Sequence, residues 1–250
     1  MKILIWDFDG VICASLKECY LITMASIERE KEKMAKEAGI KNFRPVSLQQ
    51  FDVYRSKSVN SIDFFANYIL DMKGMRLNVQ NLETTVKKHD AFLRHMDRIY
   101  DEERDVLFRR SEREYFKTLT IYPRIPETLA SLSKSGIRHS IMSARDKKSL
   151  LPILEHFNLQ RHFDLVLGSE VDKGSRHVKE KQIRLLKEHY EIPSYSGNEF
   201  YFIDDFPFNL KKLEGFAHLL FAEWGYGKLP GGYVEAKRVR APADLIKILG

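Results

Sequence analysis

Apolar residues along the chain follow two different periods. Residues 2–6, KILIW, form a short apolar run that ends in acidic residues and glycine, which predicts a buried parallel strand with a functional loop at its carboxyl end. From residue 16 the apolar positions recur every three or four residues, which predicts a helical stretch that stops at Gly39. Those positions are Leu16, Tyr20, Met24 and Ile27.

Helical spacing continues through residues 58–72 and 81–116. The second stretch carries an apolar stripe among many charges, which we interpret as a packing surface. The stripe consists of Phe92, Met96, Ile99, Val106 and Leu107. Because no alternating strand pattern occurs between about residues 14 and 118, we expect residues 15–118 to form an inserted, all-helical domain.

Strands and helices alternate in the remainder of the chain, where a first helix ends at Gly136. We expect strands at residues 139–143, 163–168, 199–205 and 217–224, and helices at residues 147–159, 178–190 and 208–216. Pro152 is tolerated if it falls in the first turn of its helix. This alternation predicts an α/β fold in which residues 1–14 and 119–250 form a parallel sheet with helices on both faces.

Composition narrows the function classes. The 250 residues are 44% hydrophobic and 30% charged, which is typical of a folded, water-soluble protein with a large core. The net charge of +6 and the pI of about 9.1 suit anionic partners. The excess is spread evenly along the chain, and no basic tract stands out. We therefore expect no nucleic-acid partner.

The cysteines and the hydropathy of the chain indicate in which cellular compartment the protein lies. Cys13 and Cys19 have a spacing that fits neither a paired-thiol redox motif nor a zinc site. No apolar run approaches the roughly 20 residues that span a bilayer, and the amino terminus lacks a signal-peptide pattern. We expect a cytoplasmic protein that does not bind membranes.

Polar residues follow the predicted strands, at the edge where ligands of parallel sheets bind. Those residues are Asp7, Asp9, Ser143, Asp204 and Asp205, and Lys179 opens the helix at 178–190. Strand alternation would point Asp7 and Asp9 the same way, and two neighbouring carboxylates repel, which predicts a cation beside them. Taken singly, each residue also fits a solvated loop, a cap or a surface lysine; their joint order favours a functional site.

This set suits phosphoryl transfer through a carboxylate. Asp7 would be the nucleophile, and Asp9 would move protons as acid and base. Mg²⁺, held by Asp7 and Asp205 with help from Asp204, would offset the repulsion between carboxylate and phosphate. Ser143 would donate a hydrogen bond to the phosphoryl oxygens, and the positive charge of Lys179 would offset the negative charge of these oxygens. We assign substrate binding to Gly10, Ser143, Ala144, Arg145 and Lys179; for Arg145 a solvated helix start is an equal alternative.

Four motifs make the chain similar to the haloacid dehalogenase-like hydrolase superfamily, chiefly its aspartate-nucleophile phosphatases. They are WDFDGVI, IMSAR, the lysine of HVKEKQ, and FIDDFPFNL. The sequence that flanks these motifs, including EWGYG near the end, resembles the phosphoglycolate phosphatase branch. The resemblance covers about residues 1–14 and 119–250. The resemblance implies a Rossmann-like core with a mobile helical cap, Mg²⁺ dependence, a phosphoaspartyl intermediate on Asp7, and a metal ligand in the main-chain carbonyl of Asp9.

Two motifs depart from the family pattern. The third lacks the usual Lys-Pro form, and Lys173 and Lys181 lie near Lys179, which is favoured by its distance from FIDD. In the fourth, Asn209 stands where a second acid often lies, so that the metal assignment is firmer for Asp205 than for Asp204.

The sequence thus predicts a Mg²⁺-dependent phosphatase of a small phosphorylated metabolite, acting as a monomer or homodimer. A phosphomutase would use the same residues, and a binding protein that lost turnover would keep the fold. The substrate itself would be chosen by the helical insert, in which no motif identifies it.

Overall fold

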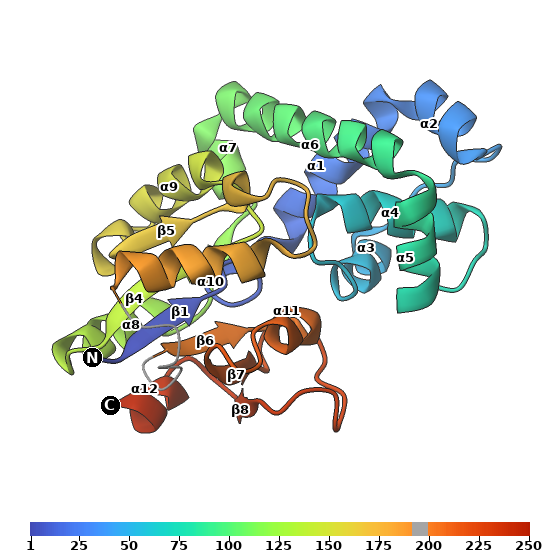
Figure 1. The fold of residues 1–250 in the computed structure, drawn as a ribbon. Coiled ribbons are helices and arrows are strands. Elements are labelled where there is room, and N and C mark those ends of the chain that lie inside the picture. Colours follow the sequence, from blue (N-terminus) through green and yellow to red (C-terminus); the bar gives the residue numbers. More distant parts are fainter. Residues whose placement is uncertain (192–199) are drawn as a thin grey trace. The chain divides into compact units, whose positions relative to one another are not determined.

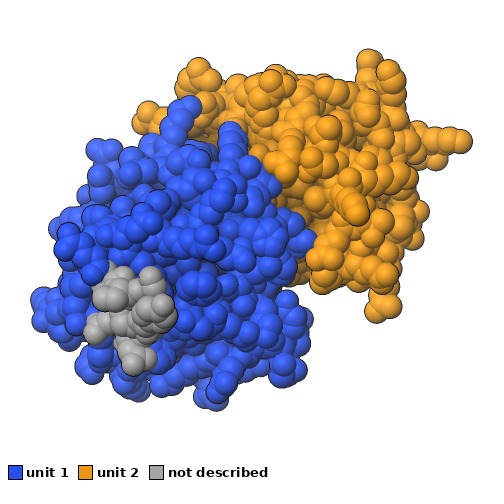
Figure 2. Space-filling model, in the orientation of Figure 1, with its two compact units in different colours: residues 1–14, 120–250 blue, residues 15–119 orange. Residues whose placement is uncertain are grey.

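The chain forms two compact units in a computed structural model that describes residues 1–191 and 200–250. Residues 1–14 and 120–250 make up the first unit, and residues 15–119 make up the second (Figure 2). In the described part of the chain, every strand belongs to the first unit.

The α/β unit is built on a parallel sheet with the strand order β5-β4-β1-β6-β7-β8 (Figure 1). Its strands are β1 (Ile3–Trp6), β4 (Arg138–Met142), β5 (Leu165–Leu167), β6 (Phe200–Asp204), β7 (His218–Ala222) and β8 (Lys237–Val239). The chain builds outward from β1 to β4 and β5, and then from β6 to β7 and β8 on the other side. The order therefore reverses between β1 and β6, where open α/β sheets bind their ligands.

Helices connect the successive strands of this sheet from β1 to β7, and one more helix follows β8. They are α8 (Ile125–Lys134), α9 (Lys147–His156), α10 (Val178–His189), α11 (Pro207–Lys212) and α12 (Asp244–Leu249), with 3₁₀ turns η1 (Gln160–His162) and η2 (Ser169–Val171). Side chains from α10 and α11, among them Ile183 and Leu210, share one buried core with Ile3 and Ile5 of β1. By strand alternation, Leu4 and Trp6 face the other side of the sheet. The predicted α/β fold is confirmed.

The chain leaves and re-enters this unit through a short antiparallel pair, β2 (Cys13–Ala14) and β3 (Thr120–Ile121). The pairing holds the two connections side by side. It was not expected from the sequence, because two residues on each side are too few to show a period.

The second unit contains only helices and has its own core. They are α1 (Leu16–Arg29), α2 (Lys31–Ala38), α3 (Leu48–Arg55), α4 (Ser61–Met72), α5 (Val79–Lys88), α6 (Asp90–Arg110) and α7 (Glu112–Phe116). Gly39 ends α2 in the left-handed region, with φ of 66°, as the sequence predicted. The stretch 81–116 is divided into three helices, and Val106 is 50% exposed, so that its assignment to the buried stripe is wrong.

Other expectations need correction. Pro152 is the sixth residue of α9 and lies beyond the first turn, so that the helix forgoes the hydrogen bond that its nitrogen would have donated. Strand β8 was not predicted, because only Val239 of its three residues, Lys237–Val239, is apolar. Glu199, expected to begin the strand at 199–205, lies outside the described residues. Within the described residues, no helix is long and apolar enough to cross a membrane.

Candidate active site

Three aspartates meet at the carboxyl edge of the sheet, where β1 and β6 pair. Trp6 ends β1 opposite Ile203, and the Asp7 amide donates to the Ile203 carbonyl at 2.9 Å. This register places Asp7 level with Asp204, the last residue of β6, and Asp205 follows directly. One carboxylate oxygen from each aspartate lies within 4.8 Å of the others, and all three residues are buried.

Lys179 brings a cation to this acidic triplet. By strand alternation Asp7 faces the same side as Ile5, the face on which α10 packs, and Lys179 is the second residue of α10. Its ammonium donates to Asp7 Oδ1 at 2.5 Å and to the Met142 carbonyl, and lies 3.9 Å from Asp204 Oδ2. Because Lys179 is only 2% exposed, its charge interacts with the triplet with little screening by water.

The two rival lysines lie elsewhere. Lys181 is exposed and pairs with Asp172 at 2.8 Å, and Lys173 is exposed in the loop before α10. The structure thus brings only Lys179 of the three to the aspartates.

Asp204 is completely buried and is held by two donors. The Phe206 amide donates to its Oδ1 at 2.7 Å, and Asn209 Nδ2 donates to its Oδ2 at 2.9 Å. Burial, and then the negative charge of Asp7, raise the pKa of Asp204 well above its usual value, although Lys179 opposes the rise. A cation beside the triplet would stabilise the ionised form. Asn209 therefore orients an acid of the site.

Asp205 is held by main-chain groups. Its Oδ2 accepts hydrogen bonds from the amides of Tyr226, at 2.6 Å, and Gly227, at 3.2 Å. Gly10, assigned to substrate binding, lies against the same carboxylate: a Cβ added to Gly10 would be 2.5 Å from Oδ2.

Asp9 does not belong to the triplet. Strand β1 ends at Trp6, and the ladder with β6 goes no further than the Asp7 amide, so that strand alternation cannot predict the direction of Asp9. Asp9 instead accepts from Arg145, with Nε to Oδ2 at 3.1 Å and Nη2 to Oδ1 at 2.8 Å. The Arg145 side chain is 1% exposed, which rules out a solvated helix start.

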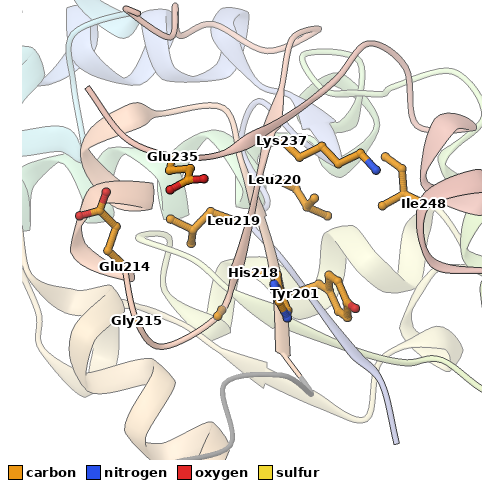
Figure 3. A pocket seen from close by; sticks show the side chains of 10 residues that line it. Tyr201, Glu214, Gly215, His218, Leu219, Leu220, Glu235, Lys237 and Ile248 are labelled. Atoms are coloured by element: carbon orange, nitrogen blue, oxygen red, sulfur yellow. The ribbon is translucent and has the colours of Figure 1, made fainter. Parts of the chain in front are cut away.

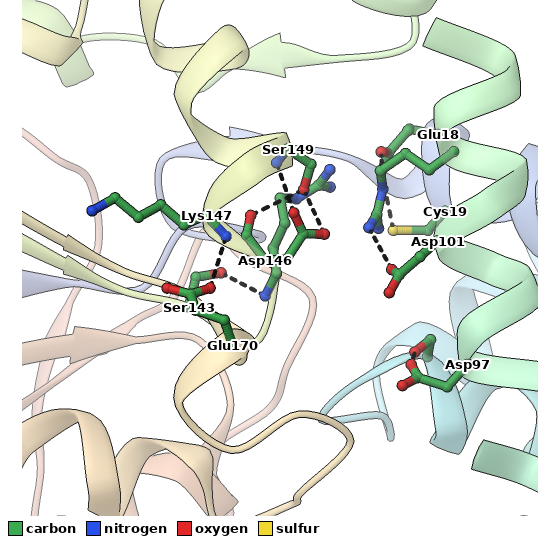
Figure 4. A network of polar contacts seen from close by, with 12 residues as sticks. Glu18, Cys19, Asp97, Asp101, Ser143, Asp146, Lys147, Ser149 and Glu170 are labelled. Atoms are coloured by element: carbon green, nitrogen blue, oxygen red, sulfur yellow. Dashed lines mark hydrogen bonds and ion pairs between the residues drawn. The ribbon is translucent and has the colours of Figure 1, made fainter. Parts of the chain in front are cut away.

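Ser143 and Ala144 follow β4. The Ser143 hydroxyl accepts from the Arg145 amide at 3.0 Å, and the Ser143 amide donates to the Leu167 carbonyl at 2.9 Å. Figure 4 shows Ser143 near the start of α9, whose cap Asp146 accepts from the Ser149 amide. Ser143 is buried and Ala144 is half-buried.

Sequence reasoning missed Gln182, which supports this turn. Its Nε2 lies within hydrogen-bond distance of the carbonyls of Ser143, Leu167 and Gly168, at 2.7, 3.1 and 2.9 Å. It is completely buried on α10. The only signal is its place three residues after Lys179, which puts both side chains on one face of the helix.

The donor set fits a hard cation. The group contains three carboxylates and neither histidine nor cysteine, and such oxygen donors suit Mg²⁺ and other hard divalent ions. Gly10 leaves room for the Asp205 carboxylate, since any side chain there would displace it. Asp7, Asp204 and Asp205 could therefore hold a metal ion.

A separate cavity of about 720 Å³ lies at the amino ends of β6, β7 and β8 (Figure 3). Tyr201, His218 and Lys237 line it, together with Glu214 and Glu235. The aspartates lie at the opposite ends of these strands, and none of them lines this cavity.

Comparison with known proteins gives one family. The model of the haloacid dehalogenase-like hydrolases matches residues 1–211. A phosphoglycolate phosphatase from Aquifex aeolicus is 25% identical over 253 aligned residues, which cover 100% of this chain and 97% of that protein.

Solved structures give the same fold. A predicted phosphoglycolate phosphatase from Haemophilus somnus superposes with a TM-score of 0.68 at 14% identity, covering 100% of this chain and 98% of the other. A predicted phosphatase from Clostridium acetobutylicum gives 0.69 at 16% identity, covering 99% and 97%. At these identities the likeness concerns the fold alone.

Proposed function

Because the chain belongs to the haloacid dehalogenase-like hydrolase family, we propose that it is a Mg²⁺-dependent phosphatase of a small phosphorylated metabolite. The observation that carries the proposal is the acidic triplet with Lys179 beside it, at the sheet edge where the strand order reverses. A carboxylate nucleophile, a fixed ammonium and a divalent cation held by the acids would together suit a dianionic substrate, which needs both a nucleophile and compensating charge.

Asp7 is proposed as the nucleophile. One of its oxygens forms a bond to phosphorus while the bond from phosphorus to the ester oxygen breaks. That oxygen leaves with a proton from the Asp9 carboxyl group, which would separate from Arg145 to carry it. Water then attacks phosphorus and gives its proton to Asp9, and the Asp7–phosphorus bond breaks to release phosphate.

The remaining residues bind and orient. Mg²⁺ held by Asp7, Asp204 and Asp205, with the Asp9 carbonyl as a further ligand, would supply the charge that offsets repulsion between carboxylate and phosphate. Lys179 adds a fixed positive charge next to the attacking group. Ser143 would donate its hydroxyl proton to a phosphoryl oxygen.

Residues 15–119 are proposed to act as the cap domain that selects the substrate. The full-length match to a phosphoglycolate phosphatase, which spans this unit as well, favours a small phosphorylated carboxylic acid. We therefore place phosphoglycolate first in a substrate panel.

The test is phosphate release from a panel of phosphorylated metabolites, with Mg²⁺ and with a chelator. We expect Mg²⁺-dependent release in the wild type and a loss of at least about a thousandfold in Asp7→Asn, because an amide is a poor nucleophile. Asp90→Asn, at an exposed position of α6, serves as the control and should act like the wild type. Metal-dependent release that survives in Asp7→Asn would contradict the mechanism.

A further inference from the structure

Residues 224–227, which follow β7, surround Asp205 although they bring no charged side chain to it. The amides of Tyr226 and Gly227 both donate to Oδ2, at 2.6 and 3.2 Å. Two donors on one oxygen restrict rotation of the carboxylate, and this also fixes the direction of Oδ1. Asp205 is 2% exposed, so that water competes little for these bonds.

Glycines lie against Asp205 at positions that leave no room for a side chain. A Cβ added at Gly225 would be 2.2 Å from the Asp205 Cβ and 2.6 Å from Oδ2, and one at Gly227 would be 1.9 Å from the Asp205 carbonyl oxygen. Gly10 also lies against this carboxylate and has φ of +97°, a conformation that favours glycine. Any larger residue at these positions must displace Asp205 or the main chain.

Trp224 connects residues 224–227 to the turn after β1 by a hydrogen bond. Its indole Nε1 donates to the carbonyl of Val11 at 3.0 Å. Val11 follows Gly10, which lies against the Asp205 carboxylate. The segment and the turn are thus joined both through this hydrogen bond and through Asp205.

From these contacts we propose that residues 224–227 are positioning residues that hold the Asp205 carboxylate ready for a divalent cation. The proposal rests on the proposed function in one respect, because it takes Asp205 as a metal ligand. It adds that the affinity for the cation is set in part by main-chain donors and glycines that touch neither cation nor substrate. Such supporting groups typically change metal affinity by 10- to 100-fold when they are altered.

The experiment compares Gly225→Ala with Gly231→Ala by calorimetric titration of the substrate-free protein with Mg²⁺. Gly231 lies in the same connection, but an added Cβ there meets no atom within 4 Å, which makes it a matched control. We expect Gly225→Ala to bind Mg²⁺ at least about tenfold more weakly than the wild type and Gly231→Ala to bind within twofold. Circular dichroism establishes that both variants are folded.

Trp224→Phe is the milder variant if Gly225→Ala does not fold. It keeps the aromatic ring and loses the donor to Val11, and we expect Mg²⁺ affinity to fall about threefold or more. Raising the Mg²⁺ concentration should restore kcat in this variant, which a general loss of structure would not allow. Folded variants at Gly225 and Trp224 that bind Mg²⁺ as tightly as Gly231→Ala would overturn the proposal.

The wild-type protein separates this proposal from the proposed function. If it binds Mg²⁺ and the variants bind it more weakly, the positioning role of residues 224–227 is supported even where no panel compound releases phosphate, and only the proposed function fails. If it binds no Mg²⁺, the positioning role is overturned.

Discussion

Replacing Arg145 with methionine should destabilise the α/β unit, because it removes the guanidinium that pairs with the Asp9 carboxylate. The planar guanidinium reaches both oxygens of Asp9, at 3.1 and 2.8 Å. The Arg145 side chain is 1% exposed and that of Asp9 is 16% exposed. Methionine keeps a long apolar stem in the same space and removes the charge and its donors.

Removing one partner of a buried ion pair costs about 3–5 kcal/mol, because the other charge stays buried and uncompensated. Asp9 retains some contact with water, which places our expectation at the low end, about 3 kcal/mol. Arg145→Lys keeps the charge but lacks the flat fork that bonds both oxygens, and losing one such bond costs about 1.5–3 kcal/mol. The expected order of stability is wild type, then lysine, then methionine.

Another arginine–aspartate pair in the same unit provides the control. Arg138 Nε lies 2.7 Å from Asp164 Oδ2, but these side chains are 43% and 36% exposed. Arg138 also lies over the ring of Tyr190, at 4.7 Å from its centroid. Exposed pairs and exposed cation–π contacts each contribute at most about 1 kcal/mol, so that Arg138→Met should cost clearly less than Arg145→Met.

Urea unfolding followed by tryptophan fluorescence measures the effect. The chain has two tryptophans, Trp6 and Trp224, and both belong to the α/β unit, so that their signal reports on that unit. Adding Asp9→Asn to Arg145→Met should restore part of the loss, because the carboxylate that lost the guanidinium is then removed. Equal losses in the two arginine variants, or additive losses at Asp9 and Arg145, would refute the reasoning.

Two further predictions concern a lysine and a histidine. Lys179→Gln should lower kcat by at least about a hundredfold, since it removes the cation 2.5 Å from Asp7, whereas Lys181→Gln on the same helix should not; equal rates would contradict this role. Burial lowers the pKa of His139 from 6.5 to about 4, so that the unfolded chain takes up a proton first as the pH falls. Unfolding free energy should therefore drop by about 3 kcal/mol between pH 6.5 and 4, and less in His139→Asn, with exposed His218→Asn as the control in urea titrations.

The family, the hydrolase class and the α/β fold were predicted from the sequence and are confirmed. The reason is that the signals are local: apolar strands end in acids, and helices between them show their period over ten or more residues. The adjacent acids Asp204 and Asp205 stood out because neighbouring like charges at the end of a buried strand are unfavourable without a cation. The proximity of Asp7 to these acids then followed from the parallel register of the sheet.

Asp9 shows where such reasoning ends. Its direction depends on where β1 stops, and the alternation of a strand gives no information once the chain turns. Arg145 could not be placed either, because an arginine beside a helix start is usually solvated. Only the fold brings the two residues, 136 positions apart, to hydrogen-bond distance.

Main-chain donors are harder still to foresee, since every residue except proline carries one. The amides that hold Asp205 leave a trace in the sequence only through the space they need: a chain that passes against a carboxylate excludes Cβ atoms, and EWGYG has glycine at both crowded positions. The main chain on both sides of Tyr226 thus approaches Asp205 so closely that only glycine fits there. The same argument explains why Gly231, a few residues further on, should tolerate alanine. A comparison of Gly225→Ala with Gly231→Ala can therefore test the positioning role of residues 224–227 without changing any charged group.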